Sequence, residues 1–136
     1  MCGIAGFVGE GSRNDLEKMI ASIKHRGPDD KGFFLSGDVG LAHARLSVID
    51  LSERGRQPMF NDDKSVGVVF NGEIYNFKKL RERLDGRGYE FKSGSDTEVI
   101  IRLYEDIGED CFKELEGMFA IGLYDFKKKK LILSLS

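Results

Sequence analysis

The sequence contains few of the residues from which disulfide scaffolds and metal centres are built. Among its 136 residues there are two cysteines, Cys2 and Cys111, and two histidines, His25 and His43. Two isolated cysteines are too few for a disulfide framework, and no Cys or His pair has the spacing of a zinc site. We therefore expect neither a disulfide-stabilised secreted domain nor a bound metal.

Long hydrophobic runs and an excess of one charge are also absent. No apolar run approaches the roughly 18 residues of a transmembrane helix, and no basic start leads into an apolar signal segment. The 21 Lys and Arg against 23 Asp and Glu give a net charge of −2, whereas binding to nucleic acid favours a basic surface. These features predict a cytoplasmic protein whose partners include neither nucleic acid nor a membrane.

The composition that remains is that of one ordinary globular domain. Hydrophobic residues make up 40% of the chain and charged residues 32%, and the length suits a single domain. The 17 glycines exceed the average of about 7% and are spread along the sequence. This distribution indicates tight turns and close backbone approaches rather than a flexible linker.

Hydrophobic periodicity predicts helices and strands in an irregular order. Apolar spacings of three and four predict helices from Asn14, Asn76 and Ser95, the last with capping-box spacing, and a helical turn after Gly108. Apolar or alternating runs predict strands over residues 3–8, 32–36, 39–43, 45–50, 66–70, 118–124 and 131–135. Because the strands cluster at both ends of the chain, the pattern indicates an α+β fold and not a doubly wound one.

Cys2 is the first candidate for chemistry. Methionine is usually removed when a small residue follows it, and removal of Met1 would leave a cysteine with a free α-amine. A thiol with a pKa near 8.5 and an amine with a pKa near 7.7–8.0 would then share one residue, as nucleophile and base. The alternative is that Cys2 is simply a small residue after the initiator methionine.

Arg45 is a candidate for binding a carboxylate. In a strand with a period of two, Arg45 shares one face with Ser47 and Ile49. A guanidinium among apolar residues suits the bidentate capture of a carboxylate. The alternative is a barrel-end or surface arginine paired with a nearby acid, either Asp50 or Glu53.

Two further segments admit both a structural and a catalytic interpretation. Asn71-Gly72 follows a predicted strand and is a strong turn signal, yet a side-chain amide beside a glycine N–H also forms an oxyanion hole. Asp96 lies beside Ser95 at a predicted helix start, where capping and the helix dipole favour an acid. Neither segment decides the function alone.

Seven segments together resemble one known family. In order they are MCGI at 1–4, HRGPDD at 25–30, HARLSVIDLS at 43–52, QPM at 57–59, NGEIYNF at 71–77, GSDTEVI at 94–100 and LEGMFAIGLYD at 115–125. They resemble the amino-terminal glutaminase domain of glutamine-hydrolysing asparagine synthetase, a class II glutamine amidotransferase. Within that class, HRGPDD and NGEIYNF favour the asparagine synthetase branch over the sugar-phosphate and purine branches. The resemblance implies an amino-terminal-nucleophile (Ntn) hydrolase fold, which is a four-layer αββα sandwich.

The resemblance also implies a role for each matching residue. Cys2 would be the nucleophile, and Asn71 and Gly72 would hold the oxyanion during attack on the glutamine side-chain amide. Arg45 would bind the α-carboxylate of glutamine, while Glu73 and Asp96 would face its ammonium group. The implied substrate-binding residues are Arg45, Leu46, Ser47, Val48, Ile49, Asn71, Gly72, Glu73 and Asp96.

Two departures from the family affect the expected domain organisation. The chain ends at LSLS, where the family continues through an Ala-Arg-Asp-like segment, and no Ser-Gly-Gly-x-Asp-like pyrophosphate loop occurs. We therefore expect residues 1–136 to be a truncated glutaminase domain, incomplete at its carboxyl end and without a synthetase domain. The glutaminase reaction needs no cofactor, so ATP and Mg are expected only in the absent synthetase domain.

Three expectations about partners follow. The substrate would be L-glutamine, hydrolysed to supply ammonia for asparagine biosynthesis, and a separate synthetase chain could receive that ammonia. The uncovered strand at residues 131–135 would favour a homo-oligomer. The alternative function is a truncated, non-catalytic relic or oligomerising module that keeps the glutaminase fold.

Overall fold

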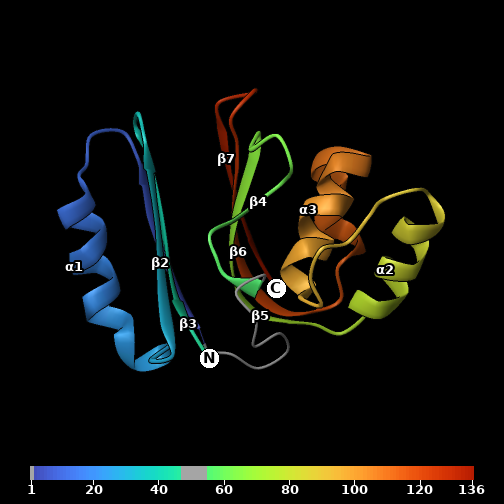
Figure 1. Cartoon of the computed structure of the whole chain (residues 1–136), viewed down its shortest axis with the longest axis horizontal. Helices are drawn as coiled ribbons and strands as arrows, with labels where there is room; N and C mark the ends of the chain where they lie inside the picture. Colours follow the sequence, from blue (N-terminus) through green and yellow to red (C-terminus); the bar gives the residue numbers. More distant parts are fainter. Residues whose placement is uncertain (1, 47–54) are drawn as a thin grey trace.

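The chain is arranged in four layers, helix, sheet, sheet and helices, in the order visible from left to right in Figure 1. The computed structural model describes residues 2–46 and 55–136. The first sheet contains three strands and the second contains four. This arrangement confirms the αββα sandwich that the resemblance implied. Within the described ranges, no helix is both long and apolar enough to cross a membrane.

The first sheet is built from the amino-terminal third of the chain. Its strands are β1 (Gly3–Val8), β2 (Asp30–Ser36) and β3 (Val39–Arg45), all antiparallel in the order β1-β3-β2. Helix α1 (Arg13–Ile23) covers the outer face and continues into a 3₁₀ turn, η1 (Lys24–Arg26). Its buried side chains, Leu16 and Ile20, pack against Ala42 and Ala44 of β3.

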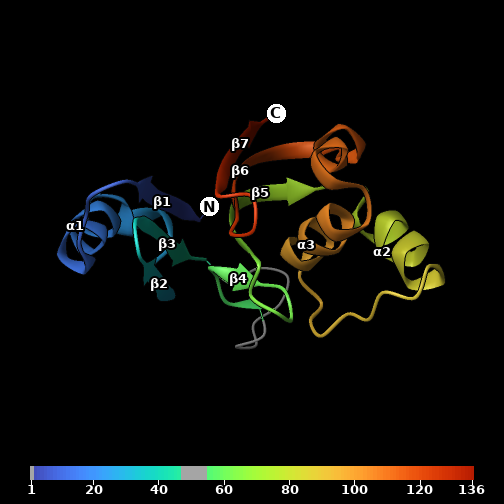
Figure 2. The same cartoon turned by 90° about the horizontal axis from the view of Figure 1, so that it is seen from above.

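The second sheet carries the larger hydrophobic core. Its strands are β4 (Met59–Phe60), β5 (Val66–Ile74), β6 (Gly117–Asp125) and β7 (Lys130–Leu135), antiparallel in that order. Helices α2 (Phe77–Gly86) and α3 (Asp96–Ile107) cover its outer face, and a 3₁₀ segment, η3 (Gly108–Glu114), leads back to β6. Viewed from above in Figure 2, the two helical layers lie on opposite outer sides of the sheets.

The two sheets pack against each other through a smaller apolar layer. Val39 and Leu41 of the first sheet contact the region of Val69 and Tyr124 of the second. Because side chains alternate along a strand, Val69 faces the first sheet while Phe70 joins the core beneath the helices. Asn71 follows the alternation and is directed, like Val69, into the space between the sheets.

The structure corrects two strand predictions. Strand β3 runs without interruption to Arg45, two residues beyond the predicted end at His43, and residues 47–50 of the predicted strand 45–50 lie outside the described part of the chain. Strand β5 continues to Ile74, so Asn71-Gly72 forms no turn. Both residues remain in register with β6, where they pair with Ala120 and Phe119.

The predicted capping box of α3 is also wrong in part. The Ser95 side chain does cap the helix by accepting a hydrogen bond from the Thr97 N–H at 3.1 Å. The Glu98 carboxylate, however, accepts hydrogen bonds from the backbone N–H groups of Lys92 and Ser93. Glu98 is therefore used to hold the loop that precedes the helix.

Candidate active site

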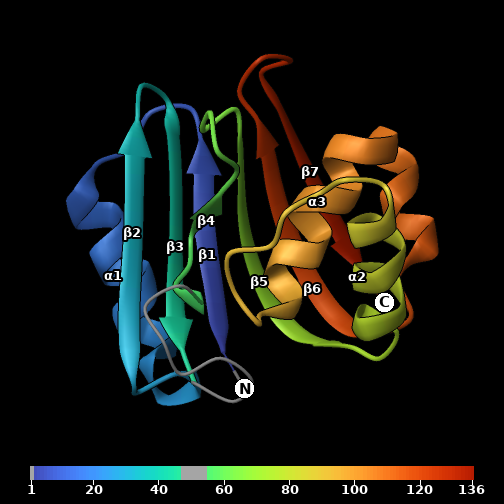
Figure 3. The same ribbon diagram turned by 45° about the vertical axis from the view of Figure 1, so that its right-hand side comes forward.

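Cys2 lies at the amino-terminal end of β1, half-buried between the two sheets. Its Sγ accepts a hydrogen bond from the Leu46 N–H at 3.2 Å and lies 3.5 Å from the Leu46 carbonyl oxygen. Its own carbonyl accepts a hydrogen bond from Arg26 Nε at 3.2 Å. In Figure 3 the N-terminus lies at the end of the molecule to which β3 and β5 run. The thiol is thus fixed beside the residue that follows Arg45.

Arg45 is a buried cation at the end of β3. It is 7% exposed and lies opposite Asp30 of β2 in the sheet register. Burial acts to raise the pKa of Asp30, but hydrogen bonds from Lys31 and Arg56 and the charge of Arg45 hold that pKa below its usual value. The guanidinium of Arg45 and the carboxylate of Asp30 therefore interact electrostatically across the two strands. Arg45 is therefore not a surface residue, whereas the acids of the alternative interpretation, Asp50 and Glu53, lie outside the described residues.

Asn71 and Gly72 are consecutive residues of β5. They directly follow Phe70, whose carbonyl is contacted by His43 near the end of β3. Asn71 Oδ1 is buried and has no hydrogen-bond partner in the described part of the chain. A buried polar oxygen without a partner is costly, which is typical of a site prepared for a ligand or a charged group.

The backbone of Gly72 can exist only with glycine. Its φ is +138°, and a Cβ there would come within 2.1 Å of the Met118 carbonyl oxygen. Its register partner on β6, Phe119, uses both its N–H and its carbonyl to bond Ser136, on the far side of β6. The Gly72 N–H therefore points away from β6, toward the open edge of β5.

Asp96 is a buried acid beside the same edge. Its Oδ2 accepts a hydrogen bond from the Ile74 N–H at 3.3 Å. Burial raises the pKa of Asp96 to about 6, an effect that hydrogen bonds from Ile74, Asp96 and Thr97 reduce and the charge of Glu73 increases. Glu73 itself is exposed on β5. The two acids give this part of the site a negative charge.

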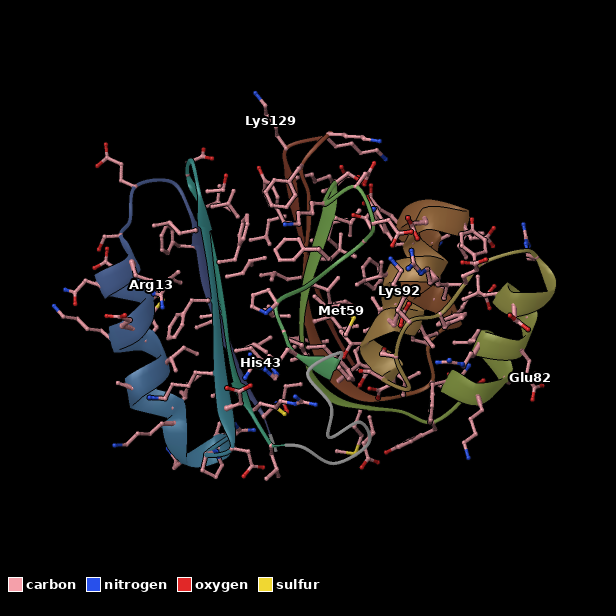
Figure 4. All side chains as sticks on the ribbon, in the orientation of Figure 1. Arg13, His43, Met59, Glu82, Lys92 and Lys129 are labelled. Atoms are coloured by element: carbon pink, nitrogen blue, oxygen red, sulfur yellow. The ribbon has the colours of Figure 1, made fainter. Side chains whose placement is uncertain are left out.

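A direct hydrogen bond joins the two halves of the site. His43 of β3 places Nε2 3.2 Å from the Phe70 carbonyl oxygen of β5. His43 is two residues before Arg45, and Phe70 is one residue before Asn71. Figure 4 shows the His43 side chain in the space between the sheets. This hydrogen bond holds the strand that carries Arg45 next to the strand that carries Asn71 and Gly72.

The structure thus brings together most of the predicted site residues, although Ser47, Val48 and Ile49 lie outside the described residues. Sequence reasoning missed three side chains that hold the site: Arg26, His43 and Gln57. The QPM motif and the histidine of HARLSVIDLS were the available signals, because a buried amide or imidazole needs a polar partner. Within the described ranges, no group of three or more His, Cys, Asp or Glu side chains is arranged to hold a metal ion.

Comparison with known proteins places the chain in a family. The sequence profile of the glutamine amidotransferase domain matches residues 1–135. The chain belongs to this glutamine amidotransferase family. Its relatives include asparagine synthetase [glutamine-hydrolyzing] 2 of Arabidopsis thaliana, 44% identical over 97% of this chain, and asparagine synthetase [glutamine-hydrolyzing] 2 of Bacillus subtilis, 41% identical over 98%.

The amidotransferase chain spans 23% of the Arabidopsis relative and 18% of the Bacillus relative. Among solved structures, glutamine phosphoribosylpyrophosphate amidotransferase from B. subtilis superimposes with a TM-score of 0.82, at 18% identity, over all of this chain and 37% of that one. This likeness shows the fold, which is that of the Ntn amidotransferases. The resemblance noted in the sequence to the glutaminase domains of asparagine synthetases is confirmed.

Proposed function

We propose that this amidotransferase domain hydrolyses the side-chain amide of L-glutamine, giving glutamate and ammonia. The observation that carries the proposal is the position of Cys2 Sγ, which the Leu46 N–H holds next to Arg45, at the end of the strand that His43 joins to β5 one residue before Asn71. In this proposal a nucleophile, a buried cation and two N–H donors, the Asn71 side-chain amide and the Gly72 backbone, occupy one site. These groups match the thiol, the carboxylate clamp and the oxyanion donors that the hydrolysis of a free amino-acid amide requires.

The first half of the reaction forms a thioester. After removal of Met1, the α-amine of Cys2 accepts the thiol proton, and the sulfur attacks the δ-carbon of glutamine. The negative charge that develops on the amide oxygen is held by the Asn71 side chain and the Gly72 N–H. The carbon–nitrogen bond then breaks, and the departing nitrogen takes the proton from the amine and leaves as ammonia.

The second half releases glutamate. Water gives a proton to the α-amine of Cys2 and attacks the thioester, the carbon–sulfur bond breaks, and the departing sulfur takes that proton back from the amine to regenerate the thiol. Arg45 holds the α-carboxylate by paired hydrogen bonds, and Asp96 with Glu73 faces the α-ammonium. This charge arrangement selects a free amino acid over an amide within a peptide.

The decisive experiment compares the two cysteines. Cys2→Ala is expected to reduce glutamate release from glutamine to background, whereas Cys111→Ala is expected to retain it. Cys111 is the matched control because it is buried in the core of the second sheet, where burial raises the pKa of its thiol to about 12. Intact-mass measurement should also show a chain without Met1. An active preparation that retains Met1 would rule out the amine as the base.

The ammonia would serve asparagine biosynthesis, as the names of the relatives indicate. In this proposal the glutaminase reaction needs no cofactor, and ATP and Mg act in a synthetase domain that receives the ammonia. A cytoplasmic location suits that role. The test is asparagine formation when the domain is combined with glutamine, ATP, Mg, aspartate and a separate synthetase chain.

A second candidate function is an oligomerising module without turnover. Strand β7 is an edge of the second sheet, and two of its leucines, Leu133 and Leu135, are 73% and 81% exposed. An apolar edge strand favours association with another chain. Sedimentation together with the glutamate-release assay separates the two functions. A dimer without glutamate release would support the module, and a monomer that releases glutamate would exclude it.

A further inference from the structure

The open edge of β5 presents three successive backbone N–H groups that point away from β6. They belong to Phe70, Gly72 and Ile74, because N–H groups alternate in direction along a strand. Asp96 accepts the hydrogen bond of Ile74, and Gln57 Oε1 accepts that of Phe70. Gly72 lies between two N–H groups that are already engaged by side chains.

Gln57 takes the position at which a backbone ladder would otherwise continue. Strand β4 pairs with β5 only at Met59↔Val68 and Phe60↔Gly67, and the same register extended by two residues sets Gln57 opposite Phe70. The main chain leaves the sheet there and approaches β2. A Cβ at Gly32 would come within 1.7 Å of the Gln57 carbonyl oxygen. The Gln57 side-chain amide therefore accepts the hydrogen bond that a strand carbonyl would have accepted.

Gln57 also connects β5 to the start of α3. Its Nε2 donates to Thr97 Oγ1 at 3.2 Å, and Thr97 follows Asp96. The side chain is 8% exposed, so both bonds form away from bulk water. In the next peptide unit, the Phe70 carbonyl accepts a hydrogen bond from His43 Nε2 at 3.2 Å. Both backbone groups of Phe70 are thus fixed by side chains, one residue before Asn71.

We infer that Gln57 is a positioning residue for the oxyanion site. It fixes the β5 backbone at Phe70, so that the Asn71 side chain and the Gly72 N–H stay aimed at one point. Within residues 2–46 and 55–136, its side-chain hydrogen bonds go to Phe70 and Thr97, and neither residue is the thiol or is assigned to the substrate. The inference rests on the proposed glutaminase reaction, because it assigns Gln57 an effect on the turnover of that reaction.

The chain contains a matched control for this inference. Asn61 is also a buried amide, 6% exposed, and its Oδ1 accepts the hydrogen bond of an N–H on β5, that of Val66, at 3.0 Å. Its Nδ2 donates to Glu105 of α3 at 3.3 Å. Asn61 therefore makes the same two kinds of contact as Gln57, but at the end of β5 that is remote from Asn71.

The experiment compares Gln57→Met with Asn61→Leu, both close to isosteric. A positioning error of about 1 Å costs on the order of 100-fold in rate, so Gln57→Met is expected to lower kcat for glutamine by roughly 10- to 100-fold. The KM for glutamine should stay within about threefold, because the substrate clamps are untouched. Gln57→Glu keeps the oxygen that accepts from Phe70 and should recover part of kcat. Asn61→Leu should leave kcat near that of the parent.

Two controls separate positioning from general damage. The rate at which iodoacetamide alkylates Cys2 needs no oxyanion donor, so it should be equal in the parent and in Gln57→Met. Amide hydrogen exchange in the parent should show Phe70 protected, and this protection should be lost in Gln57→Met only. Equal losses of kcat in Gln57→Met and Asn61→Leu, or a change confined to KM, would overturn the inference.

The exchange measurement also keeps the inference separate from the proposed function. A parent that releases no glutamate would refute the proposed function, whereas the protection of Phe70 would still decide whether Gln57 holds this part of β5. If Phe70 exchanges as fast in the parent as in Gln57→Met, Gln57 does not position the strand. If neither Gln57 variant folds, the parent alone still tests the inference, because an unprotected Phe70 amide in the parent would reject the positioning role of Gln57.

Discussion

At the scale of single residues, the candidate site contains charged and polar groups whose burial is unfavourable. Arg45 is a buried cation, Asp96 is a buried acid, and Asn71 Oδ1 is a buried oxygen without a partner in the described residues. Burial of each costs free energy, and under the proposed function a zwitterionic substrate such as glutamine would offset that cost. A cation and an acid together therefore say more about the proposed substrate than either does alone.

Arg45→Ala is expected to weaken glutamine binding. Loss of a charge-assisted bidentate contact costs about 1.5–3 kcal/mol, which corresponds to a rise in KM of roughly 10- to 150-fold. Steady-state glutamate release measures this rise, and circular dichroism checks that the fold is retained. Arg13→Ala is the control because Arg13 is an exposed residue of α1, on the outer layer in Figure 4. An unchanged KM in Arg45→Ala would show that Arg45 is structural.

At the scale of elements, strand β5 is the part that sequence patterns described least well. The periodicity located its apolar half, residues 66–70, but an Asn-Gly pair is normally a turn signal. The strand continues through this pair because β6 supplies a register partner for every residue to Ile74, and because Gly72 tolerates a φ that other residues avoid. Pairing with the distant strand β6 therefore decides whether β5 continues through Asn71-Gly72, and a local sequence pattern carries no information about that pairing.

The helices and the hairpin of β6 and β7 were predictable because their signals are local. Residues spaced by three and four, such as Leu80 and Leu84 in α2, form the buried stripe that the structure shows. By contrast, the contacts made by Gln57 and His43 join segments 13 and 27 residues apart in the sequence, at Phe70. No period or cap indicates such a contact, so the sequence alone predicted the site's chemical groups but not what holds them.

Gly72→Ala tests the strained part of β5. The new Cβ would meet the Met118 carbonyl at 2.1 Å and would require a disfavoured φ. We expect a loss of unfolding free energy of about 1–3 kcal/mol, together with a fall in kcat as the oxyanion donor moves. Urea unfolding and glutamate release measure the two effects. Gly86→Ala is the control, because nothing lies within 4 Å of its Cβ position and alanine favours a helix by about 1 kcal/mol. Equal stability of the two variants would contradict the account of Gly72.

At the scale of the whole molecule, two buried groups give the stability opposite dependences on pH. Burial lowers the pKa of His43 from 6.5 to about 4, an effect that the bond to Phe70 opposes and the charge of Arg45 reinforces. The folded protein therefore resists protonation, and His43 reduces stability as the pH falls from 6.5 toward 4. Burial raises the pKa of Asp96 from 3.8 to about 6, so Asp96 increases stability as the pH falls from 6 toward 3.8.

The two contributions have opposite signs and can be separated by substitution. Each shift is about two pKa units, which corresponds to about 3 kcal/mol over its range. We expect the unfolding free energy of the parent to change less between pH 4 and 6.5 than either contribution alone would require. Asp96→Asn keeps an oxygen for the Ile74 N–H but removes the ionisation, so it should be about 3 kcal/mol more stable than the parent at pH 7 and no more stable at pH 4.

His43→Gln should give the reverse slope, with a relative gain in stability as the pH falls from 6.5 to 4. Urea unfolding at pH 4, 5, 6 and 7 measures all three proteins. Carboxylates with lowered pKa values, such as Asp63 and Asp125, begin to reduce stability only as the pH approaches the unfolded value of 3.8, and they do so equally in all three proteins, so the comparison between variants removes their contribution. An Asp96→Asn variant with the same pH profile as the parent would show that Asp96 is solvated. In that case the Asp96 charge would not be desolvated. The argument that a bound ammonium group gains by neutralising a buried charge would then be wrong.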